Sequence, residues 1–425
     1  MARLRRLWPT LLVTLLGLPL VTPLLKWTAV PCTHDGHLHY HRVAAMKYAW
    51  EQGLHFTRWL PDLAFGYGYP FFVYREPAPL YAVLLPHLLG LPLPAASNLF
   101  YALTILACGW FMYLWVRDIL GEKAALVSAV AYMAAPYVLI DALVRGNSPE
   151  SLAMPLFPLL LWAGRRWMLN GRLRSFLITT FGIALLAFSH NISLLIFTPT
   201  LLVYLLAISL HQRQKWQTTA GRIILVFGLG LGITAFYTGG ALLEMGEVTL
   251  QQSTTTRNND FHYNFATAAE IFAPPAPEDP QLLNPPLYIR LGWIPTALAA
   301  IGTLLVMADF AKKAAKRAKD DPKKSFVRVF SAESLTAVQL HTLLMLLGTA
   351  VFLFMSLSAS LWLWENVPLI DFVQFPWRFV GRAALPIAFL AGLPFANHQS
   401  PITNYQLPIS NYQSPITIAI TIAIT

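Results

Sequence analysis

Acidic, histidine and arginine side chains gather in one polar stretch, HDGHLHYHR, at residues 34–42. On a helix that begins at Asp35, the residues Asp35, His39 and Arg42 fall at i, i+4 and i+7 and share one face. A carboxylate beside an imidazole can activate or orient a hydroxyl group, so we predict Asp35 and His39 as catalytic residues, with Arg42 in support. The alternative is that Asp35 or Thr33 only caps the helix.

A second face of the same stretch carries His34, His37 and His41. His37 and His41 have the i, i+4 spacing of metal ligands on a helix. No convincing third and fourth ligand follows in the sequence. We therefore assign no metal site and no cofactor, and a requirement for a divalent metal is left open.

Three arginines stand in motifs that could hold a phosphate. Arg75 follows the aromatic stretch RWLPDLAFGYGYPFFVY, Arg145 opens RGNSPES, and Arg378 lies in FPWRF. An outward-facing helix N-terminus with Arg145 beside it favours an anion. We predict that Arg75, Arg145 and Arg378 bind a phosphate. The alternatives are that Arg75 snorkels to lipid headgroups and that Arg378 anchors its helix at the interface.

Other polar residues receive supporting roles. Ser148 is the predicted N-cap of the helix after Arg145, and Glu150 supports the site or only complements the helix dipole. His190 lies in Ser-His-Asn between two apolar runs, and because burial without partners is costly we expect it to face a wet cavity. His262, in DFHYNF, is a further supporting candidate without a clear motif.

These polar side chains must be positioned by apolar segments, because apolar segments make up most of the chain. The 425 residues are 56% hydrophobic and only 12% charged, whereas a soluble domain has about 25% charged residues. Runs of about 20 apolar residues cross a bilayer, and they must be helical to satisfy their backbone groups. We therefore predict an all-α integral membrane protein with about ten transmembrane helices. The ten stretches are Leu7–Leu25, Asn98–Val116, Ala124–Leu143, Leu152–Trp167, Phe176–Ser189, Ile192–Ser209, Ile223–Leu243, Leu291–Phe310, Leu340–Trp362 and Phe379–Phe395.

Lys and Arg gather on every second connection between these stretches, which predicts the orientation. The N-terminus is then cytoplasmic, the first span is retained, and long outer segments cover residues 26–97 and 244–290. This orientation requires that the apolar stretch 80–93, about 14 residues long, lies in the outer interface and does not cross. The Lys-rich segment 312–328 becomes a cytoplasmic topology anchor. The net charge of +10 follows from the same rule, so nucleic acid is excluded as a partner and the plasma membrane is the predicted location.

The end of the chain differs in character. SPITNYQ, LPISNYQ and SPITIAI follow one another with a period of seven after residue 399. We predict a polytopic membrane domain at residues 1–396 and an unstructured low-complexity tail at residues 397–425.

Taken together, the strings DG-x-x-H-x-x-R, RWLPDLAFGYGYP, P-x-P-L-Y, RGNSPE, SHN and QFPWRF resemble the bacterial 6-pyruvoyl-tetrahydropterin-synthase-related membrane proteins. More distantly, they resemble integral-membrane glycosyltransferases of the GT-C fold. The resemblance covers residues 7–395 and implies an interfacial helix in the first outer loop. It also implies that Asp35 acts on the acceptor, and that basic residues hold a polyprenyl-phosphate sugar donor at the outer leaflet.

The chain departs from the GT-C pattern in two ways. Its first loop has a single clear candidate acid in place of a paired-acid motif, and it lacks the C-terminal spans or soluble domain that many relatives carry. The predicted function is a membrane glycosyltransferase with membrane lipid and a lipid-linked sugar as partners. Two alternatives stay open: a lipid or polysaccharide transporter, which would place charges or broken helices near mid-bilayer, and a non-catalytic or truncated membrane protein.

Overall fold

The computed structural model describes residues 2–247, 257–275, 282, 286–320 and 335–397. These residues form helices joined by loops, with isolated bridges at Leu60–Tyr69 and Ala266–Leu357. The α-helices are α1 Ala2–Val21, α2 Gly36–Glu51, α3 Phe71–Tyr74, α4 Ala78–Leu88, α5 Leu93–Leu120, α6 Glu122–Met133, α7 Pro136–Ile140, α8 Ser148–Asn170, α9 Leu173–Ser189, α10 Asn191–His211, α11 Trp216–Leu243, α13 Ala268–Ile271, α14 Trp293–Asp320, α16 Ala337–Ser356, α17 Leu361–Asn366 and α18 Arg378–Gly392. Shorter turns are η1 Thr22–Leu24, η2 Asp141–Arg145, η3 Met245–Glu247, η4 Phe261–Tyr263, η5 Ser358–Ser360, η6 Ile370–Val373 and η7 Leu393–Phe395.

The described helices confirm a multi-pass, all-α membrane protein. Six are long and apolar enough to cross a bilayer, or seven if the bent pair α6 and α7–η2 counts as one span. The other predicted spans fall on α1, α8 and α9, and the apolar parts of α1 and α9 are shorter. The count of about ten therefore stays a prediction.

α4 bears on the orientation. It is an 11-residue helix, Ala78–Leu88, that overlaps the apolar stretch 80–93 and is too short for a full crossing. Its position in the outer interface stays a prediction. The Lys-rich segment 312–328 is described only to Asp320, as the end of α14, and the tail after Asn397 lies outside the described residues.

The bend between α6 and α7 has a local cause. α7 begins at Pro136, and Ala135 before it has the extended backbone (φ −58°, ψ 129°) that a following proline imposes. The two parts of the predicted span Ala124–Leu143 meet at 43°. The second part continues as the π-helical turn η2 and ends at Gly146, which has φ 69°. Asp141 and Arg145 lie on this turn after the bend, and both side chains are buried in the bundle.

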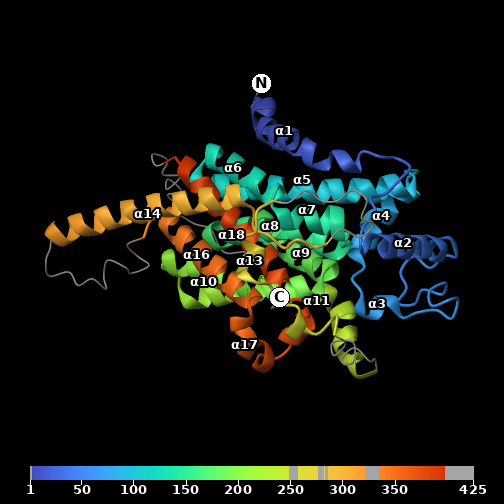
Figure 1. Ribbon diagram of the computed structural model, residues 1–425. Coiled ribbons are helices and arrows are strands. Elements are labelled where there is room, and N and C mark those ends of the chain that lie inside the picture. Colours follow the sequence, from blue (N-terminus) through green and yellow to red (C-terminus); the bar gives the residue numbers. More distant parts are fainter. Residues whose placement is uncertain (1, 248–256, 276–281, 283–285, 321–334, 398–425) are drawn as a thin grey trace.

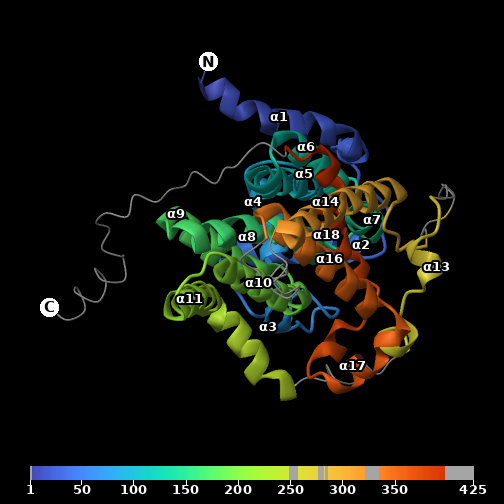
Figure 2. The ribbon, with the colours of Figure 1, turned by 90° about the vertical axis from the view of Figure 1, so that its left-hand side faces the viewer.

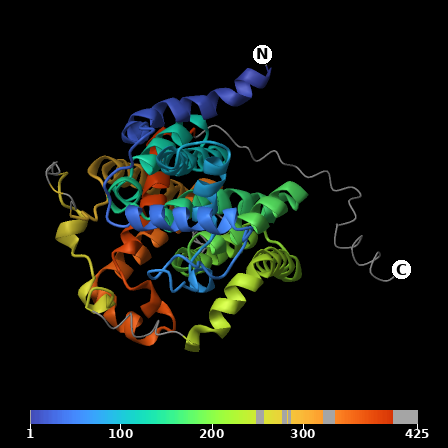
Figure 3. The same ribbon diagram turned by 90° about the vertical axis from the view of Figure 1, so that its right-hand side faces the viewer.

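The bundle has one central helix and several peripheral ones. Every residue of α18 is buried, whereas the apolar windows of α11 and α14 are mostly exposed, as expected for helices facing lipid. Figure 2 shows α1 and α11 on opposite flanks, with α5 and α8 between them. In Figure 1, α2 and α3 lie at one end of the bundle, and α14 extends beyond it at the other end. Figure 3 looks onto the first end, where the first outer segment (blue) crosses the other helices.

Candidate functional site

The start of α2 rests directly on the turn that precedes α8. The Asp35 N–H donates to the Arg145 carbonyl at 2.7 Å, and the His34 N–H donates to the Val144 carbonyl at 3.1 Å. A Cβ at Gly146 would lie 2.9 Å from the Gly36 Cα. Glycine at this position therefore permits the backbone approach that brings Asp35 next to Arg145.

The Asp35 side chain does not cap α2. Instead, the Thr33 hydroxyl accepts a hydrogen bond from the Gly36 N–H at 3.1 Å, and no cap bond forms with the Asp35 carboxylate. That carboxylate lies 3.5 Å from Arg145 Nε and 3.5 Å from Asn147 Nδ2. Its side chain is 38% exposed, so Asp35 combines a fixed backbone with a carboxylate that molecules outside the protein can reach.

Glu150 is the centre of a buried polar network. It is 0% exposed, and it accepts hydrogen bonds from Arg145 Nη1 at 2.7 Å and from the Tyr137 hydroxyl at 2.7 Å. Arg382 also donates to it, and Arg378 Nε lies 3.7 Å away. Buried charges persist when they are paired and hydrogen-bonded, and here one carboxylate pairs with guanidinium groups from η2 and from α18.

The network extends in two directions. Asp141 accepts from Arg145 Nη1 at 3.0 Å and from the Ser151 hydroxyl at 2.9 Å. On the other side, Arg382 Nη2 donates to Ser193 Oγ at 2.6 Å, and Ser193 Oγ lies 2.7 Å from His190 Nδ1. A continuous chain of contacts thus joins Asp35 at the surface to His190 inside the bundle.

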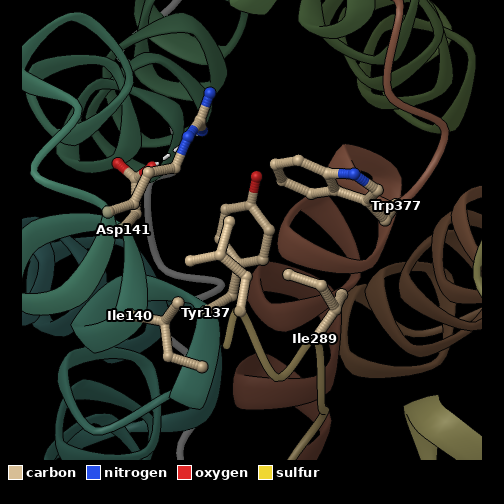
Figure 4. Close-up of a pocket in the computed structure, with 7 residues that line it drawn as sticks. Tyr137, Ile140, Asp141, Ile289 and Trp377 are labelled. Carbon is tan, nitrogen blue, oxygen red and sulfur yellow. Dashed lines mark hydrogen bonds and ion pairs between the residues drawn. The ribbon is translucent and has the colours of Figure 1, made fainter. Parts of the chain in front are cut away.

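A narrow crevice lies over Asp141 and Arg145 (Figure 4). Tyr137, Ile140 and Trp377 line it, together with Leu287 and Ile289 from the second outer segment. The crevice has no room for a water molecule. The Arg145 guanidinium lies 5.2 Å from the centre of the Trp377 ring, so Trp377 is a cation–π partner of the network as well as an aromatic residue at a helix start.

A second hollow is open and lies beside α2. It has a volume of about 290 Å³ and is lined by Leu38, His41, Arg42, Leu63, Ala64, Tyr69, Phe71 and Arg75. The Arg42 guanidinium stacks 5.0 Å from the centre of the Phe71 ring. Burial lowers the pKa of Arg42 to about 10, so this group is cationic at neutral pH. We call this hollow the Arg42–Arg75 pocket.

His39 is buried on α2, near arginines of both the Arg42–Arg75 pocket and the buried network. Burial lowers its pKa to about 3, and the positive charges of Arg42, Arg75 and Arg145 act in the same direction. The imidazole beside Asp35 is therefore neutral at physiological pH. His39 Nδ1 lies 3.5 Å from Arg42 Nη1, which suits a ring nitrogen that accepts.

Comparison with known proteins identifies the fold. A family model described as dolichyl-phosphate-mannose-protein mannosyltransferase matches residues 77–237. The apo crystal structure of the Archaeoglobus fulgidus oligosaccharyltransferase superposes with a TM-score of 0.50 at 13% identity, covering 98% of this chain and 54% of that one. The chain has the GT-C fold. The narrower resemblance to the 6-pyruvoyl-tetrahydropterin-synthase-related proteins stays a prediction.

Two further matches are weaker in structural similarity or shorter in aligned length. A second structure of the archaeal oligosaccharyltransferase, solved with an inhibitory peptide and a dolichol-phosphate, has a TM-score of 0.47 at 13% identity and covers 99% of this chain and 54% of that one. An uncharacterized protein of Lactococcus lactis subsp. cremoris (strain MG1363) is 24% identical over 217 residues, which is 48% of this chain and 34% of that protein. The chain thus spans about half of the archaeal enzyme and about a third of the bacterial protein.

Within this GT-C fold, the three arginines predicted to bind phosphate lie at two different places. Arg75 is exposed and lines the Arg42–Arg75 pocket. Arg145 and Arg378 are buried and paired with Glu150. Neither of the two hollows described above contains both Arg75 and Arg145.

Three other expectations need correction. Asn147 caps α8 by accepting from the Glu150 N–H at 2.9 Å, so the predicted cap Ser148 is the first helical residue. His190 is buried against Ser193 and does not face a wet cavity, because protein groups supply its partner. His262 contacts Asp260 and Glu365, so it belongs to a separate cluster beside α17.

Several residues of the site were not selected from the sequence: Tyr137, Asp141, Asn147, Ser193 and Arg382. Two of them carried a usable signal. Asp141 precedes Arg145 by four residues and Arg382 follows Arg378 by four, so each pair shares a helix face. Charged residues inside apolar helices are themselves a mark of a functional site.

Metal ligands are a separate question. Within the described parts of the chain, no group of three or more His, Cys, Asp or Glu side chains could hold a metal ion. His37 and His41, which have ligand spacing, are both exposed on α2.

Proposed function

We propose that this GT-C protein is a membrane glycosyltransferase that takes its sugar from a polyprenyl-phosphate carrier and transfers it to an acceptor on the outer face of the plasma membrane. The observation that carries the proposal is the Asp35 carboxylate. The Asp35 side chain is not used as a helix cap, it is partly exposed, and Asp35 directly precedes α2, the helix that lines the Arg42–Arg75 pocket. The family match at residues 77–237 supports a lipid-phosphate donor.

The proposed reaction is a displacement at the anomeric carbon of the sugar. An acceptor hydroxyl attacks that carbon while its proton moves to the Asp35 carboxylate. The bond from the carbon to the phosphate oxygen breaks, its electron pair stays on that oxygen, and polyprenyl phosphate leaves. Such acid–base assistance contributes about 10²- to 10⁴-fold, and neutral His39 orients polar groups without competing for the proton.

We assign the arginines two different roles. Arg75 and Arg42 hold the departing phosphate, because they face an open pocket whose remaining lining is mostly apolar and aromatic and guanidinium groups bind phosphate well. Arg145 and Arg378 hold Glu150 and the turn before α8, and Arg145 in turn holds Asp35 through its carbonyl and its guanidinium.

Binding of polyprenyl monophosphate to the purified protein tests this assignment. Loss of a charge-assisted hydrogen bond costs about 1.5–3 kcal/mol, so Arg75→Ala and Arg42→Ala should each weaken binding at least about tenfold. Arg58→Ala is the matched control, because Arg58 lies in the same outer segment but pairs with Glu244. Equal binding by all four proteins would contradict the proposal.

A transporter remains a second candidate for a specific reason. The described bundle contains a span bent by 43° and buried charges at Asp141, Arg145, Glu150, Arg378 and Arg382. Transporters use both features. Flipping of a fluorescent polyprenyl-phosphate lipid by proteoliposomes, unaffected by Asp35→Asn, would favour this candidate over the transferase.

A further inference from the structure

Arg75 occupies a short corner between α3 and α4. Its side chain is exposed and lines the Arg42–Arg75 pocket. The residues on either side of it, Tyr74 and Glu76, are at least partly buried. Their contacts therefore decide how the corner presents the guanidinium.

Both neighbours of Arg75 are bound to the break between α9 and α10. The Asn191 N–H donates to Glu76 Oε1 at 3.0 Å, and Asn191 Nδ2 approaches the Tyr74 carbonyl at 3.4 Å. A carboxylate at the first residue of a 21-residue helix also complements the helix dipole and satisfies an N–H that has no partner within α10.

A residue from a third helix completes the arrangement. Tyr237 on α11 donates its hydroxyl hydrogen to the Tyr74 carbonyl at 3.3 Å and accepts from Asn191 Nδ2 at 3.0 Å. Tyr237 is buried, so water does not replace these bonds readily. The corner is thus fixed on both sides of Arg75, while the Arg75 side chain itself stays directed to the pocket.

We infer that Asn191 and Tyr237 are positioning residues that fix the Tyr74–Glu76 corner and so aim Arg75 into the Arg42–Arg75 pocket. This gives the Ser-His-Asn tripeptide a role beyond the His190 contact: its asparagine holds Glu76 and Tyr74, which lie 115 and 117 positions earlier in the chain. The inference rests on the proposed function only for the identity of the ligand that Arg75 meets.

The order of the corner can be measured without any ligand. A nitroxide spin label is attached at position 75 in an Arg75→Cys, Cys32→Ser protein, in which Cys108 is buried. We expect Tyr237→Phe to increase the mobile fraction of the label's spectrum. Thr238→Val is the matched control, because the Thr238 hydroxyl donates to the Thr234 carbonyl within α11 itself. An unchanged spectrum in Tyr237→Phe overturns the inference.

The effect on binding is tested with polyprenyl monophosphate in the native-cysteine protein. We expect Tyr237→Phe to weaken binding by about 2- to 10-fold, the range for a lost neutral hydrogen bond. In an Arg75→Ala background the same change should have no further effect, because coupled residues are not additive. Additive losses would mean that Tyr237 only stabilises the fold, and would overturn the positioning role.

The two measurements separate the two proposals. A wild-type protein that binds no polyprenyl phosphate overturns the proposed function, while the spin-label spectra still decide whether the corner is held. Asn191→Ala removes more hydrogen bonds than Tyr237→Phe. If the Asn191→Ala protein fails to fold, the Tyr237→Phe protein alone tests the positioning role.

Discussion

Glu150 is the residue on which the buried network depends. It pairs with Arg145, Arg378 and Arg382, and it has no exposed surface. Removing one partner of a buried ion pair typically costs about 3–5 kcal/mol, because the other charge is left without compensation. We therefore expect Glu150→Gln to lower the free energy of unfolding in detergent by about that amount.

Glu244→Gln is the control for this prediction. Glu244 also accepts from an arginine, Arg58, but both side chains are more than 40% exposed. Exposed pairs contribute about 0–1 kcal/mol, so this variant should unfold close to wild type. Equal unfolding midpoints for the two variants would contradict the account of the network.

His39 should make stability depend on pH. Its pKa is about 3 in the folded protein and about 6.5 when unfolded. Between these values the unfolded chain binds a proton that the folded chain does not, so stability falls as the pH is lowered below about 6.5. The slope approaches about 1.4 kcal/mol per pH unit.

The unfolding midpoint at pH 7.5 and pH 5.0 measures this effect. His39→Gln should lose less stability than wild type over that interval. His37→Gln, which changes an exposed histidine on the same helix, should lose as much as wild type. A wild-type-like loss in His39→Gln would show that another group causes the dependence.

At the residue scale, the sequence predicts which side chains are neighbours when they are close together in the chain. The shared face of Asp35, His39 and Arg42 follows from helical spacing alone. The contact of Arg382 with Glu150, 232 residues apart, does not, because no local pattern says which helices pack together. The roles of Thr33 and Asn147 as caps depend on side-chain rotation, which the sequence leaves open.

At the scale of elements, the site exists because α2 lies against the turn between η2 and α8. Gly146 has a positive φ, and an added Cβ would lie 2.3 Å from the Thr33 hydroxyl oxygen. Gly66 also has a positive φ, but no atom lies within 4 Å of its ideal Cβ. An alanine would therefore be strained in its backbone at either position, but only at position 146 would its Cβ also collide with a neighbouring residue.

We expect Gly146→Ala to reduce both stability and sugar transfer strongly, since it pushes Asp35 away from Arg145. Gly66→Ala should cost only the strain of a left-handed alanine, about 1–2 kcal/mol. Thermal unfolding and transfer activity of the two variants provide the comparison. If both lose activity equally, close contact at Gly146 is not what positions Asp35.

The helices could be predicted in part, because the property that marks them is also local in the sequence. Each predicted apolar stretch coincides with a described helix or pair of helices, because hydropathy is a local property. Hydropathy does not predict the bend before Pro136, because the residues on both sides of that proline are apolar and read as one continuous stretch. Hydropathy reports that a segment enters the membrane, not whether it remains straight there.

At the scale of the whole molecule, the account requires α2 and the basic end of α14 to lie on opposite sides of the bilayer. They are at opposite ends of the bundle (Figure 1), and the positive-inside rule puts the basic end in the cytoplasm. Single cysteines introduced as Asp62→Cys and Lys313→Cys in a Cys32→Ser protein test this with an impermeant maleimide. We expect labelling of intact cells at position 62 only, and labelling at position 313 only after permeabilisation. Labelling at position 313 in intact cells would contradict the orientation.

The most direct test of the central claim is sugar transfer by the Asp35→Asn protein. Purified wild type and variant are incubated with polyprenyl-phosphate sugars and with cell-envelope acceptors, and the product is counted. Asparagine preserves the shape of the side chain but cannot take a proton. We predict a fall in kcat of about 10²- to 10⁴-fold at an unchanged unfolding midpoint, with Asp62→Asn, an exposed acid in the same outer segment, close to wild type. Transfer by Asp35→Asn at the wild-type rate would contradict the claim.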